Sequence, residues 1–201
     1  MLLAQVTAFG EDTGDVERPS APFEAVAFGA YRGGGTFDIE GSEENADVAE
    51  HVSLALAFDY KVDEQSAYQL FFSRQSTKVT AGGEQTGLLV KYFMVGGTLG
   101  IEDMSRVHPY VAGLVGLARF SLDEPGARDD SRFAISVGVG MRMPLREQFD
   151  LRVEGRGYVT FLDSDSSLFC QSGGAQSGCL LRGNGSTFVQ FELLAGLAWS
   201  F

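Results

Sequence analysis

The last fifteen residues of the chain, Thr187 to Phe201, alternate between two kinds of side chain. Counting back from the C-terminus, every second residue is apolar and, with one alanine excepted, large: Phe201, Trp199, Leu197, Ala195, Leu193, Phe191 and Val189. The residues between them are mostly small or polar and include one charge, Glu192. A period of two with unlike faces predicts a β-strand that separates two different environments.

Seven further segments repeat this alternation and bring the expected number of strands to eight. They are residues 23–37, 52–61, 66–77, 86–101, 107–122, 132–143 and 149–162. The links after the second, fourth and sixth strands are short, whereas those after the first, fifth and seventh are longer. Short turns at one end and long loops at the other are typical of transmembrane barrels, with the turns in the periplasm. The sequence therefore predicts an all-β fold, an eight-stranded antiparallel up-and-down transmembrane β-barrel with both termini periplasmic.

The length and composition fit a single barrel domain. The chain has 201 residues, and its uncharged apolar runs are shorter than the ~20 residues of a membrane-spanning helix but match the ~9–11 of a spanning strand. We expect residues 23–201 to form the barrel. Residues 1–22 start with an apolar segment that lacks a basic region, and we interpret them as a signal-peptide remnant and periplasmic tail. A merely apolar tail without a targeting role is the alternative.

The size of the side chains decides which face of each strand points outward. One face carries Phe, Tyr, Trp, Leu, Ile and Val, and the other mixes Gly, Ala and Ser with isolated charges. A narrow barrel cannot hold a large side chain at every inward position, so the large apolar face is expected to contact lipid. The alternative is a soluble lipocalin-like ligand-binding barrel, which has an apolar interior and a polar exterior.

The charges on the strands are then expected to point into the lumen. Charges of both signs in a narrow interior must be paired, because an unpaired buried charge costs several kcal/mol. The hypothesis is a salt-bridge network that plugs the barrel, and the alternative is a polar conduit or ligand site. The predicted lumen residues are Glu24, Arg32, Asp59, Lys91, Arg119, Arg142, Arg152, Glu154, Arg156 and Glu192.

Other kinds of chemistry have little support in the sequence. Cys170 and Cys179 lie in one Ser/Gly-rich segment with no nearby histidine, which favours a local disulfide over a metal site and indicates an oxidising compartment. The net charge of −12 opposes nucleic-acid binding. His51 and His108 are expected to lie far apart, so we predict no metal site and no cofactor. A lipid-modifying enzyme is the remaining catalytic alternative to a non-enzymatic protein.

Three segments resemble the small eight-stranded outer-membrane barrels of the OmpA/OmpX/OmpW-like superfamily. They are the terminal strand from Phe191 to Phe201, the charged segment from Leu151 to Tyr158, and residues 28–35. The resemblance implies a Gram-negative outer-membrane location, contact with outer-membrane lipids and lipopolysaccharide, and recognition of Phe201 and Trp199 by the assembly machinery. It implies a structural or surface-interaction role with an unspecified extracellular partner. The OmpW-like members imply the alternative of a narrow, porin-like pore or a conduit for small hydrophobic molecules.

Overall fold

The computed structural model describes residues 21–38, 45–81, 84–101, 106–122, 129–162, 167–170, 179–182 and 187–201. Eight long strands dominate this part of the chain and four short ones accompany them. The long strands are β1 (Phe23–Gly33), β4 (His51–Lys61), β5 (Ser66–Ala81), β6 (Glu84–Gly100), β7 (His108–Leu122), β8 (Asp130–Arg146), β9 (Phe149–Phe161) and β12 (Thr187–Ser200). The short strands are β2 (Thr36–Asp38), β3 (Asn45–Val48), β10 (Ser167–Cys170) and β11 (Cys179–Arg182).

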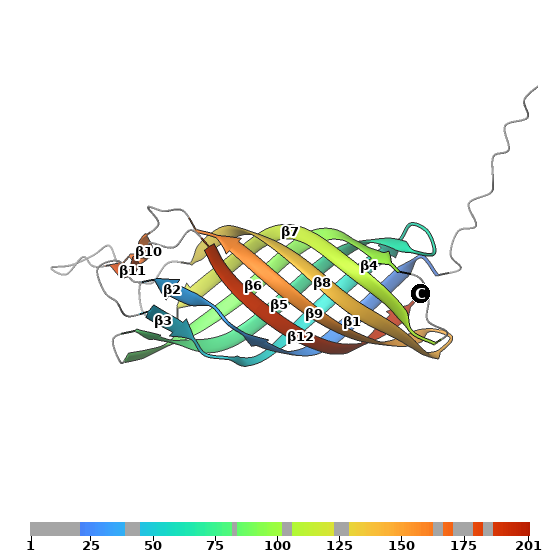
Figure 1. Ribbon diagram of the computed structural model, residues 1–201, viewed down its shortest axis with the longest axis horizontal. Helices are drawn as coiled ribbons and strands as arrows, with labels where there is room; N and C mark the ends of the chain where they lie inside the picture. Colours follow the sequence, from blue (N-terminus) through green and yellow to red (C-terminus); the bar gives the residue numbers. More distant parts are fainter. Residues whose placement is uncertain are drawn as a thin grey trace, which may run out of the picture.

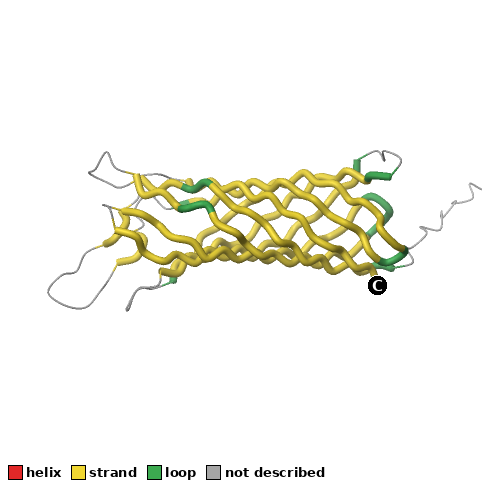
Figure 2. The backbone as a smooth tube through the Cα atoms, turned by 90° about the horizontal axis from the view of Figure 1, so that it is seen from below, coloured by secondary structure: helices red, strands yellow, loops and turns green. Residues whose placement is uncertain are grey.

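The eight long strands form a closed antiparallel barrel. Each strand pairs with its neighbours in the order β1, β4, β5, β6, β7, β8, β9, β12, and β12 then pairs with β1 to close the cylinder. The strands run obliquely around the long axis in both side views (Figure 1, Figure 2). The predicted eight-stranded transmembrane barrel is therefore confirmed as a fold.

The two ends of the barrel differ, and we name them from their contents. The turn end carries the C-terminus and the β4–β5 and β8–β9 turns, at residues 62–65 and 147–148. There the backbone of Phe201 exchanges hydrogen bonds of 2.9 and 3.2 Å with that of Phe23. The loop end carries β2, β3, β10 and β11 (Figure 1). This asymmetry follows the predicted pattern of short and long links.

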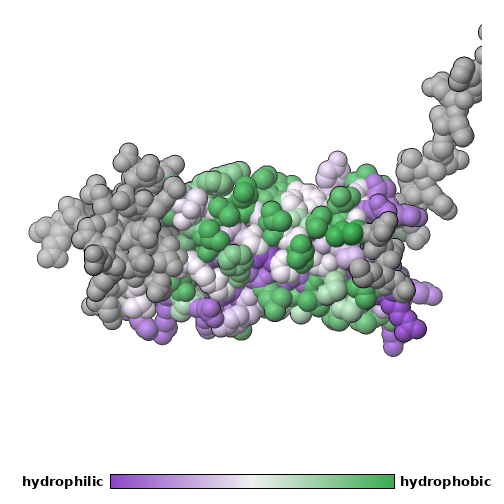
Figure 3. Space-filling view, viewed as in Figure 1, coloured by the Kyte–Doolittle hydropathy of each residue, from purple (hydrophilic) through white to green (hydrophobic). Residues whose placement is uncertain are grey.

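The exterior of the barrel is apolar. Large outward side chains on the long strands are exposed, among them Leu54, Val137 and Phe191 at 71%, 65% and 67%. Apolar residues cover much of the middle of the surface in view (Figure 3). A soluble lipocalin-like barrel needs a polar exterior, so that alternative is wrong. No helix in the described residues is long and apolar enough to cross a membrane.

The first and third strands end differently from the expectation. The first was predicted to continue to residue 37, but β1 stops at Gly33 and a separate short strand, β2, follows. Gly34 and Gly35 between them have φ angles of 81° and 103°, a left-handed conformation that interrupts an extended strand. The third strand was predicted to end at Thr77, whereas β5 stays paired with β6 as far as Ala81 opposite Glu84.

The lumen holds more aromatic side chains than the sequence indicated. Fully or almost fully buried rings project inward from six strands: Phe28, Phe71, Tyr92, Tyr110, Phe120, Tyr158 and Phe188. Small residues opposite them provide the space. Gly140 is the cross-strand partner of Tyr110, and a Cβ atom on it would lie 2.4 Å from the tyrosine ring. The expectation of a lumen of small residues and charges was thus incomplete, because inward glycines make room for rings.

Candidate functional site

The lumen charges form two hydrogen-bonded clusters, and the one near the turn end begins with two acids and one arginine. Glu24 on β1 and Asp59 on β4 are direct cross-strand partners. Like charges placed directly opposite each other destabilise a sheet. Arg152 on β9 resolves this conflict, because its Nη1 lies 3.0 Å from Glu24 Oε1 and 2.6 Å from Asp59 Oδ2. All three side chains are fully buried.

Two further cations surround Glu24 at the mouth of the turn end. Arg142 Nη2 lies 3.2 Å from Glu24 Oε1, and Lys61 Nζ lies 3.5 Å from Glu24 Oε2. The Lys61 ammonium also donates to Ser200 Oγ at 3.0 Å. Both cations are about three-quarters buried, whereas Glu24 is fully buried. The negative charge of Glu24 is therefore shared among three cations from three different strands.

The middle of the network joins Glu154 and Arg156, which are two residues apart on the inward face of β9. Arg156 Nε donates to Glu154 Oε1 at 2.5 Å, and Tyr110 donates its hydroxyl to Glu154 Oε2 at 2.6 Å. Gln69 links this pair to the group of Glu24, Asp59 and Arg152 nearer the turn end. It accepts from Arg156 Nη2 at 3.0 Å and donates to Asp59 Oδ1 at 2.8 Å.

Glu192 on β12 is the centre of a second cluster nearer the loop end. Arg32 Nη2 lies 2.9 Å from Glu192 Oε1, and Ser53 and Ser73 donate to the same oxygen at 2.5 and 3.0 Å. Tyr158 donates its hydroxyl to the other carboxylate oxygen. The carboxylate thus binds one guanidinium and three hydroxyls, all from buried side chains.

Aromatic rings complete the environment of Arg32. Its Nε and Nη1 atoms form no hydrogen bond with the described residues, but its guanidinium carbon lies 4.9 and 5.2 Å from the ring centres of Tyr92 and Tyr158. These two rings stack on each other at 4.2 Å. A guanidinium over an aromatic face gains a cation–π interaction where hydrogen bonds are lacking.

Toward the loop end the lumen becomes apolar. Phe120 and Phe188 pack edge to face at 5.5 Å between their ring centres, and both are fully buried. Leu88, Val90 and Leu162 are buried with them. The interior therefore has charged layers from the turn end to its middle and an apolar layer nearer the loops.

The charges of the network nearly balance. Four fully or almost fully buried carboxylates face three such guanidinium groups, and Arg142 and Lys61 add positive charge at the turn end. Water reaches almost none of these groups, since the buried members are at most 3% exposed. Hydrogen bonds and ion pairs of these clusters join seven long strands through the interior, and the Tyr92 hydroxyl on β6, which donates to Gln190 Oε1 on β12 at 3.0 Å, adds the eighth. It can hold the barrel in register and obstruct the lumen.

Two of the ten predicted lumen residues face the other way. The structure places Glu24, Arg32, Asp59, Arg142, Arg152, Glu154, Arg156 and Glu192 in the lumen. Lys91 and Arg119 lie on the outer surface, because the flanking Val90, Tyr92, Ala118 and Phe120 are the fully buried inward residues. The prediction for these two residues is wrong. Both faces of their strands are apolar, so the sequence offers only the charge as a sign of direction, and the charge does not settle it.

Several uncharged members of the network were not singled out from the sequence. They are Ser53, Gln69, Ser73, Tyr92, Tyr110, Tyr158 and Gln190. The alternation contains the signal that finds them, because each occupies an inward position of its strand. On a strand with one clearly large apolar face, such as β4, the opposite face points inward, and the polar residues on it then become candidate partners.

The remaining predicted sites lie at the two ends. Trp199 and Phe201 are at the turn end, with ring centres 4.7 Å apart. Cys170 and Cys179 are register partners of the β10–β11 hairpin. Such partners have Cα separations of about 4.5–5.5 Å, which a disulfide can span. The disulfide remains a prediction, and residues 1–20, which cover most of the predicted N-terminal tail, lie outside the described residues. Within the described part of the chain, no group of three or more His, Cys, Asp or Glu side chains could hold a metal ion.

Comparisons with known proteins agree with this architecture. The family model for the outer membrane protein beta-barrel domain matches residues 19–200. Neisserial surface protein A is similar in structure, with a TM-score of 0.59 and 15% identity over 90% of this chain and 98% of that one. The outer membrane protein AlkL gives 0.56 and 17% over 100% and 96%. OprG from Pseudomonas aeruginosa gives 0.50 and 13% over 93% and 99%. No curated protein sequence matches the chain.

Proposed function

Since this chain belongs to the outer-membrane β-barrel protein family, we propose that it is a non-enzymatic barrel whose lumen is plugged by its own side chains and whose loops interact at the cell surface. In this proposal the turn end and both chain termini face the periplasm. The loop end, with β2, β3, β10 and β11, faces the exterior.

The observation that carries the proposal is the burial of the network. Arg32 and Arg152, two of the longest side chains in the lumen, are both fully buried in different layers of the barrel. An open channel would leave such side chains in contact with water. Their paired carboxylates, Glu192 and Asp59, are equally inaccessible, so moving either arginine aside would leave a buried charge without its partner.

Conductance across planar lipid bilayers tests the plug. The wild-type barrel is expected to carry no ion current at any salt concentration or voltage. A variant in which Arg32, Arg152 and Arg156 are all replaced by alanine is expected to conduct, because the three most deeply buried lumen cations are then truncated. In the matched control, glutamine replaces Arg106 and Arg146, which are exposed at the turn end. The barrel of this variant is expected to stay closed.

A steady current through the wild-type protein would contradict the plug and favour the pore alternative. Entry of a small apolar dye into liposomes that contain the wild-type barrel, without any ion current, would favour the conduit for hydrophobic molecules. For every variant, heat-modifiable migration on gels checks that the barrel has folded.

The orientation is tested separately in intact cells. An epitope tag inserted between β10 and β11 is expected to be accessible to external antibody. The same tag inserted in the exposed β8–β9 turn, between Glu147 and Gln148, is expected to become accessible only when the outer membrane is permeabilised. The opposite pattern would reverse the proposed orientation without affecting the conductance result.

A further inference from the structure

Three cations form a row across the outer surface of neighbouring strands. Arg74 on β5 is the direct cross-strand partner of Lys91 on β6, and Lys91 is the partner of Arg119 on β7. All three point outward, because the residues on either side of each, such as Ser73 and Gln75 beside Arg74, are buried in the lumen. With strands about 4.8 Å apart, the row extends about 10 Å from end to end.

The row marks a boundary on the outer surface. The next outward residues toward the turn end are Phe72, Phe93 and Leu117, which are themselves cross-strand partners. The Phe72 and Phe93 rings contact each other with centres 4.9 Å apart. Phe93 and Leu117 are 49% and 51% exposed, as expected for side chains that face lipid. The cations therefore lie one step above the apolar surface, at the level of lipid headgroups.

Nothing within the described residues neutralises the whole row. Asp129 accepts from Arg119 Nη2 at 2.6 Å and Nε at 3.1 Å, and this exposed pair balances one charge. Hydrogen bonds from the Ser121 hydroxyl and the Arg119 guanidinium, together with the nearby charges of Arg119 and Lys91, lower the pKa of Asp129. Arg74 and Lys91 form no ion pair with any described carboxylate. Like charges directly opposite each other destabilise a sheet, so an external anion would stabilise this one.

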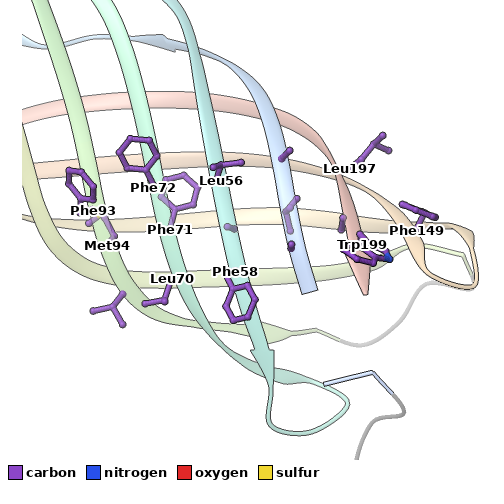
Figure 4. A pocket seen from close by; sticks show the side chains of 16 residues that line it. Leu56, Phe58, Leu70, Phe71, Phe72, Phe93, Met94, Phe149, Leu197 and Trp199 are labelled. Atoms are coloured by element: carbon purple, nitrogen blue, oxygen red, sulfur yellow. The ribbon is translucent and has the colours of Figure 1, made fainter. Parts of the chain in front are cut away.

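An apolar depression adjoins the row on the same surface. Its volume is about 800 Å³, and it begins at Phe72 and Phe93 and reaches Trp199 and Phe149 at the turn end. Figure 4 shows the Phe72 and Phe93 rings side by side on β5 and β6, with Leu56 on β4 beside Phe72 and with Leu70 and Phe58 nearer the turn end. A hydrocarbon chain that descends from a headgroup at the cation row would enter this depression.

We propose that Arg74, Lys91 and Arg119 bind the phosphate groups of a phosphorylated, multiply acylated lipid of the lipid A type, and that its acyl chains lie along Phe72 and Phe93 in the depression. The occupant follows from charge and position. A chain with a net charge of −12 places a row of three cations, only one of them paired with a described carboxylate, where its apolar belt ends. Because the row lies toward the loop end, assignment to the outer leaflet rests on the orientation proposed above.

Lipid binding to the detergent-folded full-length chain tests the site by native mass spectrometry. The probes are bisphosphorylated lipid A, the same lipid without its phosphates, and zwitterionic phosphatidylethanolamine. The wild-type barrel is expected to prefer the bisphosphorylated form. Replacing Arg74 and Lys91 by glutamine is expected to weaken its binding about 30-fold, since each basic residue near a headgroup contributes about 1 kcal/mol.

Two further variants serve as controls for the lipid-binding measurement. R106Q/R146Q removes the same charge at the turn end and should bind lipid A as the wild type does, and R74K/K91R should retain binding. The site is overturned if R74Q/K91Q matches either of them, or if removing the phosphates changes nothing. Because the measurement is made in detergent, neither conductance nor orientation affects it.

Discussion

Arg32 and Glu192 are direct cross-strand partners in the β1–β12 pair that closes the barrel, and their side chains form a fully buried ion pair of 2.9 Å. The first and last long strands are therefore joined by an ion pair as well as by backbone hydrogen bonds. Glu192 is also the cross-strand partner of Arg156 on β9, which places it between two arginines of neighbouring strands. The closing strand thus carries the carboxylate on which the loop-side cluster converges.

Replacing Glu192 by glutamine should weaken this closure. The substitution keeps the shape and one acceptor but leaves the buried Arg32 guanidinium without a counter-charge, which we expect to lower the free energy of unfolding by about 3 kcal/mol. Urea titration of the folded barrel in detergent micelles measures this change in the free energy of unfolding. The exposed turn residue Glu147, changed to glutamine, is the matched control and should behave as the wild type. Equal stability of the two variants would show that the ion pair does not hold the seam.

Arg152 gives a prediction with a pH dependence. With methionine in its place, Glu24 and Asp59 remain directly opposite each other without the guanidinium that bridges them. The barrel should be destabilised by about 3–5 kcal/mol near neutral pH, and the deficit should shrink in acid because protonation removes the repulsion. Urea titrations at several pH values measure this, with Arg146→Met at the exposed turn end as the control. A deficit that is independent of pH would point to lost packing instead.

The period-two alternation predicted the barrel because each long strand separates lipid from lumen, and an error in one strand end does not disturb the others. It could not place Lys91 and Arg119, since the rows of Leu88, Val90, Tyr92 and Met94 on one face and Leu89, Phe93 and Val95 on the other are similarly apolar. At the membrane boundary a charged side chain can point outward to the headgroups. The sequence of a single strand does not show where that boundary lies. Only the register across β5, β6 and β7 shows that their charges lie beside Arg74.

The close approach of Gly140 to the Tyr110 ring predicts that one methyl group added at Gly140 lowers the stability of the barrel. A Cβ at Gly140 would lie 2.4 Å from the Tyr110 ring, which hydrogen bonds to Glu154 and cannot shift freely. We expect Gly140→Ala to cost about 1–3 kcal/mol of unfolding free energy through overpacking. Gly113→Ala is the matched control, because an added Cβ there meets nothing within 4 Å. Thermal unfolding followed by gel migration compares the two, and equal midpoints would contradict the close packing.

The hairpin of β10 and β11 predicts a redox-dependent labelling pattern. If Cys170 and Cys179, which are register partners, form a disulfide, the folded protein should react with a thiol-alkylating reagent only after reduction. Mass spectrometry of the intact chain should then show two added groups. Cys170→Ser should react at its single remaining thiol without reduction. Labelling of both cysteines in the unreduced protein would exclude the bond.

The β4–β5 turn predicts a pH-dependent contribution to stability from Asp63. Its carboxylate accepts from the backbone N–H groups of Gln65 and Ser66 at 2.8 and 2.7 Å and from the Ser66 hydroxyl. These bonds, the hydroxyl bond most strongly, lower the pKa of Asp63 below its ordinary value of 3.8. A carboxylate with a lowered pKa in the folded state stabilises fully above its unfolded pKa and loses that contribution as pH falls through the folded one.

The stability difference between the wild type and Asp63→Ala should therefore stay constant near neutral pH and shrink as the pH falls below 3.8. Urea titrations at a series of pH values measure this difference. Glu64→Ala, one residue along the same exposed turn, provides the control for simple loss of a surface charge. If the Asp63→Ala deficit persists unchanged in acid, the carboxylate hydrogen bonds do not stabilise the turn, and the substitution acts through the backbone instead.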